Sequence, residues 1–294
     1  MLGLALLTLL ALGCGGATTA PTTAPETAGT ATPAEAATDR ATSSTEGTIY
    51  HYRKSNHDGG QIEQMALYVP APDRFEAFFF IAGKGQAELV VGTLAPHGRW
   101  AETLEIWARY VQGHGERLAR LETRLGADGR PRELHAEVEP PADLRVNHPA
   151  LAAVARGAQT LPLTGHPPHI YAFDLVTLML ALRQHDAATP LTVTLVQPTF
   201  QPQPPYFETL GEITLTDEGE EMRLDQPCRR YRVAGEALGP DGGGHLWLHR
   251  DTRVLIEAVL GRANNPQWRN LRLVFERSEP SDAAGWQRVQ QRAW

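Results

Sequence analysis

The stretch LWLHRDTRVLIEAVL at residues 246–260 predicts a β-hairpin. Two apolar runs, each of strand length, are joined by a charged turn. Leucines alternate with His245, Trp247 and His249 in and around the first run, so a strand would place these three side chains on one face. The second run would return beside the first and cover the same side of a sheet.

Similar short runs, separated by turn residues, extend from Thr48 to about residue 277. The run at 116–125 also fits a helix through its leucines, but the Asp-Gly turn and the alternating run at 127–139 favour another hairpin. About a dozen strands are expected, more than the ~5–6 of an average sheet. We therefore expect a mainly β (α+β) fold, with a large antiparallel curved sheet or unclosed half-barrel that limits exposed edges.

Helical patterns are confined to the middle and the end of the chain. AFDLVTLMLALRQH (172–185) is apolar nearly all round, which predicts a long helix buried on more than one side, across the concave face of the sheet. NHPALAAVARGAQ (147–159) predicts a short helix. The polar segment 281–294 is either a short C-terminal helix or a tail.

The order of FDLVTLMLALRQ (173–184), CRRYRV (228–233), the 246–260 hairpin and LRLVFE (271–276) resembles a bacterial envelope domain of unknown function. That family is similar to the lipoprotein carriers of the LolA type, in which a helix lies across the apolar mouth of an unclosed half-barrel. The resemblance implies an architecture and a cell-envelope location. It implies no established activity.

The N-terminus predicts export and a lipid anchor. Residues 1–13 are apolar and uncharged, which is typical of a signal peptide, and Ala11-Leu12-Gly13-Cys14 resembles the bacterial lipobox. Residues 14–46 are rich in Ala, Thr and Pro without an aromatic side chain, which predicts a disordered tether spanning ~30 Å. The alternatives are an ordinary secretory signal with an incidental cysteine, and an O-glycosylated stalk.

These segments set the expected organisation and location. The folded part should be a single half-barrel domain at 47–294. In a cell with two membranes, Gly15 after the cysteine favours the outer membrane, because the residue that retains many lipoproteins at the inner membrane is Asp. If Cys14 carries lipid, Cys228 has no disulfide partner within the chain.

Composition argues against several functional classes. The formal net charge is −7 and no basic block is present, so nothing indicates a nucleic-acid partner. No nucleophile, metalloprotease or phosphate-loop motif occurs, and no cofactor is indicated. His245, His249 and Asp251 are candidate metal ligands, but a zinc site needs three or four converging ligands, and solvated strand histidines explain them more simply.

The sequence leaves an apolar interior as the candidate site. We expect a lipid or acyl chain to bind there, without catalysis. The candidate binding residues are Phe78, Phe80, Phe173, Val176, Met179, Leu180 and Trp247. The alternatives are an envelope assembly or protein-interaction module that has no ligand, and a metal-dependent hydrolase.

Overall fold

The computed structural model describes residues 47–80, 86–110, 115–140, 154–170, 175–199, 201–261 and 270–292. The expected signal peptide, the tether and Cys14 lie outside these ranges, as does Phe173. Neither helix in the described part of the chain combines the length and the apolar character needed to cross a bilayer.

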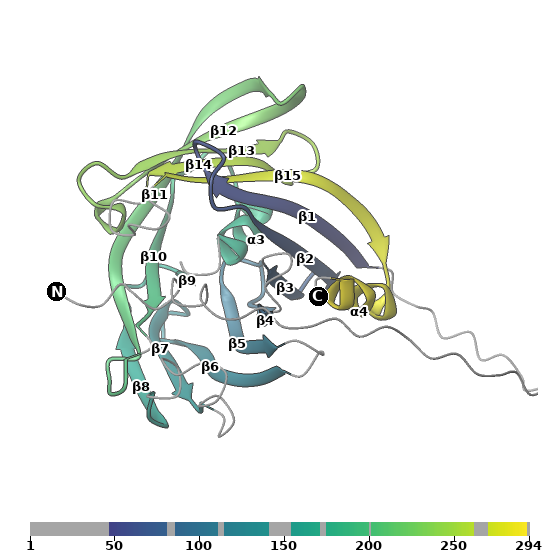
Figure 1. The fold of residues 1–294 in the computed structure, drawn as a ribbon. Coiled ribbons are helices and arrows are strands. Elements are labelled where there is room, and N and C mark those ends of the chain that lie inside the picture. The colour runs from purple at the N-terminus through teal and green to yellow at the C-terminus, as the bar shows by residue number, and fades with distance from the viewer. Residues whose placement is uncertain are drawn as a thin grey trace, which may run out of the picture.

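The described residues form one strongly curved sheet of 15 strands (Figure 1). The strands are β1 (Gly47–Asn56), β2 (Glu63–Ala71), β3 (Arg74–Phe80), β4 (Gln86–Leu94), β5 (Ala101–Tyr110), β6 (Gly115–Leu125), β7 (Pro131–Val138), β8 (Gly157–Pro162), β9 (Pro168–Ile170), β10 (Leu191–Pro198), β11 (Phe207–Arg223), β12 (Gln226–Ala234), β13 (Gly243–His249), β14 (Leu255–Gly261) and β15 (Asn270–Ser281). Their order is β8-β7-β6-β5-β4-β3-β2-β1-β15-β14-β13-β12-β11-β10-β9. The expected mainly β, unclosed sheet is confirmed.

Neighbouring strands pair antiparallel throughout, except that β9 and β10 are parallel. The sheet is therefore mixed, whereas the sequence predicted an antiparallel one. Its two ends, β8 and β9, are not paired with each other. Register shifts interrupt several ladders, including β5–β6 and β13–β14, and such bulges increase local twist and bending. They help a sheet of this width to curl.

Alternation along the strands gives the sheet two different faces. The inner face is defined here as the one whose side chains join the main core, which includes Phe75, Ile106, Leu195 and Leu246. At Gly92 an added Cβ would lie 2.4 Å from the ring of Phe75, so the small residue allows that ring to pack closely against β4. The opposite, outer face carries two smaller apolar clusters.

Two α-helices and one 3-10 turn, η2 (Glu236–Leu238), occur in the described ranges. Helix α3 (Val176–Gln184) lies within the predicted 172–185 and is buried from Val176 to Leu182. Helix α4 (Ala283–Arg292) settles the C-terminal alternative in favour of a helix. The helix predicted over 147–159 is wrong at its end, because Gly157–Gln159 pair with β7 as part of β8; residues 147–153 lie outside the described ranges.

Candidate functional site

Helix α3 belongs to the main core, together with residues from both halves of the sheet. Val176, Met179 and Leu180 are each at most 3% exposed. Their core includes Val90 from β4 and Leu246 from β13, strands far apart in the sheet order. The helix is apolar nearly all round, so it can be buried on several sides without removing polar side chains from water.

The C-terminal end of α3 is held by polar contacts. Nη2 of Arg253, in the turn between β13 and β14, donates hydrogen bonds of 2.8 Å to the carbonyl oxygens of Leu182 and His185. Those carbonyls lack partners within the helix, and a cation there also complements the helix dipole. Cζ of Arg183 lies 4.3 Å from the centre of the Tyr50 ring on β1. The charged turn of the 246–260 hairpin therefore anchors the helix.

The N-terminal end of α3 has a different character. Leu175 precedes the helix with φ 69° and ψ 9°, and no side chain caps the first turn. A left-handed conformation costs a leucine roughly 1–2 kcal/mol. The helix therefore begins at a strained residue and ends at a well-bonded one.

A buried histidine lies beside the first turn of α3. Nδ1 of His169, on β9, is 2.8 Å from Oγ1 of Thr177. Burial alone lowers the pKa of His169 to about 3, which keeps the ring neutral at physiological pH. Its Nε2 is buried without a hydrogen-bond partner in the described part of the chain.

Two small cavities flank this core, and each has a volume of about 10 Å³, room for roughly one water molecule. The first is lined by Leu118, Ala119, Val138, Pro140, Val154, Tyr206 and Phe207. The second is lined by Ala101, Leu104, Leu121, Thr123, Leu134, Pro168, Ile170 and Thr177. Where the sequence predicted a ligand, the main core includes the side chains of α3.

The predicted ligand residues do not form one surface. Val176, Met179 and Leu180 lie together in the main core. Phe78 and Phe80 belong instead to the outer face of β3, in the cluster that also contains Trp286 of α4. In that cluster the Phe78 and Trp286 rings are 6.3 Å apart and perpendicular. Alternation explains the split, because Phe79 between them is the phenylalanine that points inward.

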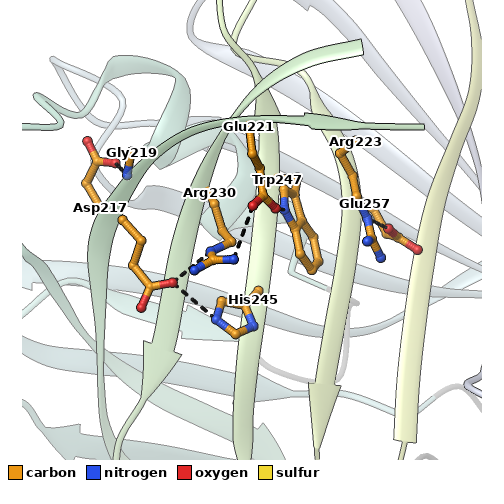
Figure 2. Close-up of polar contacts among 9 residues, drawn as sticks. Asp217, Gly219, Glu221, Arg223, Arg230, His245, Trp247 and Glu257 are labelled. Carbon is orange, nitrogen blue, oxygen red and sulfur yellow. Dashed lines mark hydrogen bonds and ion pairs between the residues drawn. The ribbon is translucent and has the colours of Figure 1, made fainter. Parts of the chain in front are cut away.

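Trp247 lies in the second outer cluster, with Cys228 and Ile256. Its indole Nε1 donates to Glu221, and the guanidinium of Arg223 lies 4.1 Å from its ring centre (Figure 2). These contacts leave the indole 6% exposed, so it belongs to the packed outer face of β11–β14.

The same outer face contains a fully buried carboxylate, Glu257. It accepts a 2.7 Å hydrogen bond from Nε of Arg272. A second hydrogen bond comes from Nε of Arg223, which lies beside Glu257 in Figure 2. One charged partner on each side compensates for the loss of water around this buried charge. The arrangement binds β11, β14 and β15 together.

The candidate metal ligands do not converge. Nε2 of His245 lies 3.2 Å from Glu218, whereas Nδ1 of His249 accepts hydrogen bonds from the backbone N–H groups of Asp251 and Thr252. Within the described ranges, no group of three or more His, Cys, Asp or Glu residues is placed to hold a metal ion.

No protein-family model matches this chain, and no curated protein matches it. Among solved structures, the MucA/MucB complex of Pseudomonas aeruginosa is similar over 84% of this chain and 56% of that chain, at 12% identity and a TM-score of 0.26. A DUF1329 family protein of Desulfovibrio piger is similar over 82% of this chain and 87% of that chain, at 8% identity and a TM-score of 0.24. The chain spans about half the length of the MucB chains that it matches.

Several residues that position this site were not identified from the sequence. His169 is one, and Arg253 was assigned only to a charged turn. Gln159, whose side chain contacts the start of β11, is another. Arg253 follows the first leucine-rich run of a hairpin, which gives a weak signal, but nothing local marks Gln159, because its partners are 47 and 48 residues away.

Proposed function

We propose that this protein is a membrane-anchored envelope lipoprotein whose half-barrel binds a single apolar chain, such as a lipid acyl chain, without catalysis. The observation that carries the proposal is α3 itself, a helix buried from Val176 to Leu182 in the main core. In this proposal α3 lies across the concave face and takes the place of the ligand until one arrives. The ligand then contacts the inner-face side chains that α3 covers.

The two ends of α3 suit such an exchange. Strain at Leu175 favours departure of the N-terminal end, since leaving the helix lets that residue relax. Arg253 keeps the C-terminal end attached, so the helix would pivot rather than detach. Displacing the helix exposes apolar surface, which only an apolar ligand would cover again.

The anchor is a second part of the proposal. Cys14 would carry the lipid, and residues 15–46 would allow the half-barrel to reach ~30 Å from the membrane. Such a tether suits a protein that meets its ligand at, but not inside, a bilayer. In a cell with two membranes we propose the outer one.

Equilibrium titration with 11-(dansylamino)undecanoic acid tests the binding proposal. Wild-type protein should raise the probe's fluorescence saturably, and native mass spectrometry of the purified protein should reveal co-purified lipid. The Arg253→Ala variant should bind more tightly, because a weaker hold on α3 lowers the cost of displacing it. Arg250→Ala is the matched control in the same turn, and should bind as the wild type does. Absence of saturable binding would exclude the proposal.

A protein-interaction module is the second candidate, and the tip of the β11–β12 hairpin favours it. Met222 and Leu224 are 65% and 45% exposed there. Leu224 also has φ 48°, where Asn or Gly is usual. If a partner protein binds this tip, Met222→Ser with Leu224→Asn should abolish a crosslink formed by a photoreactive residue at position 226. The same crosslink should survive Leu125→Ser at another exposed turn.

A further inference from the structure

The curved sheet almost meets itself where β8 approaches β11. These strands are not paired, because β8 ends the sheet order on one side and β9 and β10 lie beyond β11 on the other. The gap is bridged by the side chain of Gln159: its Oε1 accepts hydrogen bonds from the backbone N–H groups of Tyr206 (2.7 Å) and Phe207 (3.0 Å), and its Nε2 donates to the carbonyl of Phe207 (2.8 Å). We call this junction the β8–β11 seam.

The seam differs physically from the ladders elsewhere in the sheet. One side-chain amide there replaces a backbone ladder, and one backbone hydrogen bond, of 3.0 Å from Ala155 N–H to the carbonyl of Pro202, lies nearby. Breaking a seam of this kind takes few hydrogen bonds, all of which water can replace. Local opening therefore costs less free energy at the seam than at a paired strand.

The first cavity lies directly behind the seam. Tyr206 and Phe207, the residues bound by Gln159, form part of its lining, and its other lining residues are aliphatic. The Tyr206 ring fits against β8 because residue 157 is glycine, where an added Cβ would lie 2.6 Å from the tyrosine hydroxyl oxygen. Movement of Tyr206 and Phe207 away from β8 would join this cavity to the outside.

We propose that the β8–β11 seam is the entry for an unbranched acyl chain, and that the cavity behind it, which has room for about one water molecule in the closed state, widens as the seam opens and takes the first segment of the chain. This proposal rests on the proposed function. Gln159 is a positioning residue, because its amide holds the entry shut in the absence of ligand. The apolar lining selects a hydrocarbon chain, and a passage opened only by movement of Tyr206 and Phe207 admits a single unbranched one.

Hydrogen exchange of the full-length protein tests the opening without any ligand. In the wild type, the amides of Tyr206 and Phe207 should exchange at least about tenfold faster than those of Ile213 and Leu215, which lie farther along β11, away from the seam. Gln159→Leu should accelerate the two seam amides further. Gln197→Leu is the matched control, since the Gln197 side chain bonds the Glu208 side chain on the neighbouring strand pair and forms no hydrogen bond with the seam residues in the described part of the chain. Seam amides that exchange as slowly as the paired ones would overturn the proposal.

Stopped-flow binding of 11-(dansylamino)undecanoic acid tests the entry route. Gln159→Leu should raise the association rate constant several-fold, and Gln197→Leu should leave it unchanged. Gly157→Ala, which pushes Tyr206 away from β8, should raise the association rate constant as Gln159→Leu does. Agreement between the two variants would show that the effect does not come from a folding defect in one of them. Fast seam exchange with an unchanged association rate would exclude the seam as the entry while leaving binding intact. A wild-type protein that binds no probe would instead contradict the proposed function.

Discussion

Nη2 of Arg253 lies 2.8 Å from the carbonyl oxygen of Leu182, the last fully buried residue of α3. Through this contact, the turn between β13 and β14 holds the C-terminal end of a helix that lies in the core. The turn holds Arg253 at φ 58°, a left-handed conformation, and its side chain reaches the end of α3. The hairpin at 246–260 therefore has a role beyond its two strands.

Removal of this guanidinium should destabilise the fold. Arg253→Ala leaves the carbonyls of Leu182 and His185 without their charged donor, which should lower the free energy of unfolding by about 2 kcal/mol. Urea denaturation measures the change. Arg250→Ala should unfold at the wild-type urea concentration, and equal losses in the two variants would contradict the anchoring role.

His169 should make stability depend on pH. Burial lowers its pKa in the folded protein to about 3, whereas an unfolded histidine titrates near 6.5, so folding favours the neutral ring. Its contribution is complete above pH 6.5 and is lost as the pH falls toward 3, by up to about 1.4 kcal/mol per pH unit. Urea denaturation at pH 7 and pH 5 should show a smaller acid loss for His169→Gln, whose amide can still bond Thr177. Identical losses would show that His169 does not titrate on unfolding.

Glu257 should be a strong stabilising residue of the outer face. Glu257→Gln removes a buried charge between Arg223 and Arg272, which should cost about 2–3 kcal/mol, since both arginines can partly regain water. Glu220→Gln is the control, because that carboxylate is half exposed and lies 3.7 Å from Arg250. If Glu257→Gln unfolded at the same denaturant concentration as the wild type, Glu257 would not be a strong stabilising residue.

Trp286 should stabilise the fold without contributing to the affinity for the apolar ligand. Its ring stacks on Tyr68 with centres 5.4 Å apart and covers Phe78 from the outer face. Trp286→Ala should lower the free energy of unfolding by about 3 kcal/mol. Its affinity for the dansyl probe should stay at the wild-type value at low temperature, where the variant remains folded. Lost affinity in the folded variant would place the ligand on the outer face.

Cys14 should determine membrane attachment. Expressed from the full gene in a bacterial host, wild-type protein should partition into the detergent phase, and Cys14→Ser should remain in the aqueous phase. Cys228→Ala should partition as the wild type does. Aqueous wild-type protein would favour an ordinary secretory signal over a lipid anchor.

The sequence predicted the strands well because their signal is local. The 246–260 hairpin is confirmed as β13 and β14, since alternation and turn residues both lie within a few positions. The predicted helix at 147–159 failed at Gly157–Gln159, where pairing with β7 overrides a helical composition. The strand count was too low, because Pro168–Ile170 is too short for periodicity to reveal.

The candidate site was harder to predict than the fold. Phe78, Phe79 and Phe80 form one apolar run, and only the structure shows that Phe78 and Phe80 pack in the outer cluster with Trp286 of the distant α4. The same holds for Gln159, whose hydrogen bonds join residues far apart in the chain. The sequence shows which residue types are available for such contacts. The curvature of the sheet determines which of these residues come into contact.

Hydrogen exchange of α3 with and without 11-(dansylamino)undecanoic acid tests the central claim most directly. If the ligand replaces the helix, the amides from Met179 to Leu182 should exchange faster in the saturated complex, while those of β13 and β14 stay protected. Slower or unchanged exchange in α3 on saturation would show that the helix is a fixed part of the core, and would contradict the account.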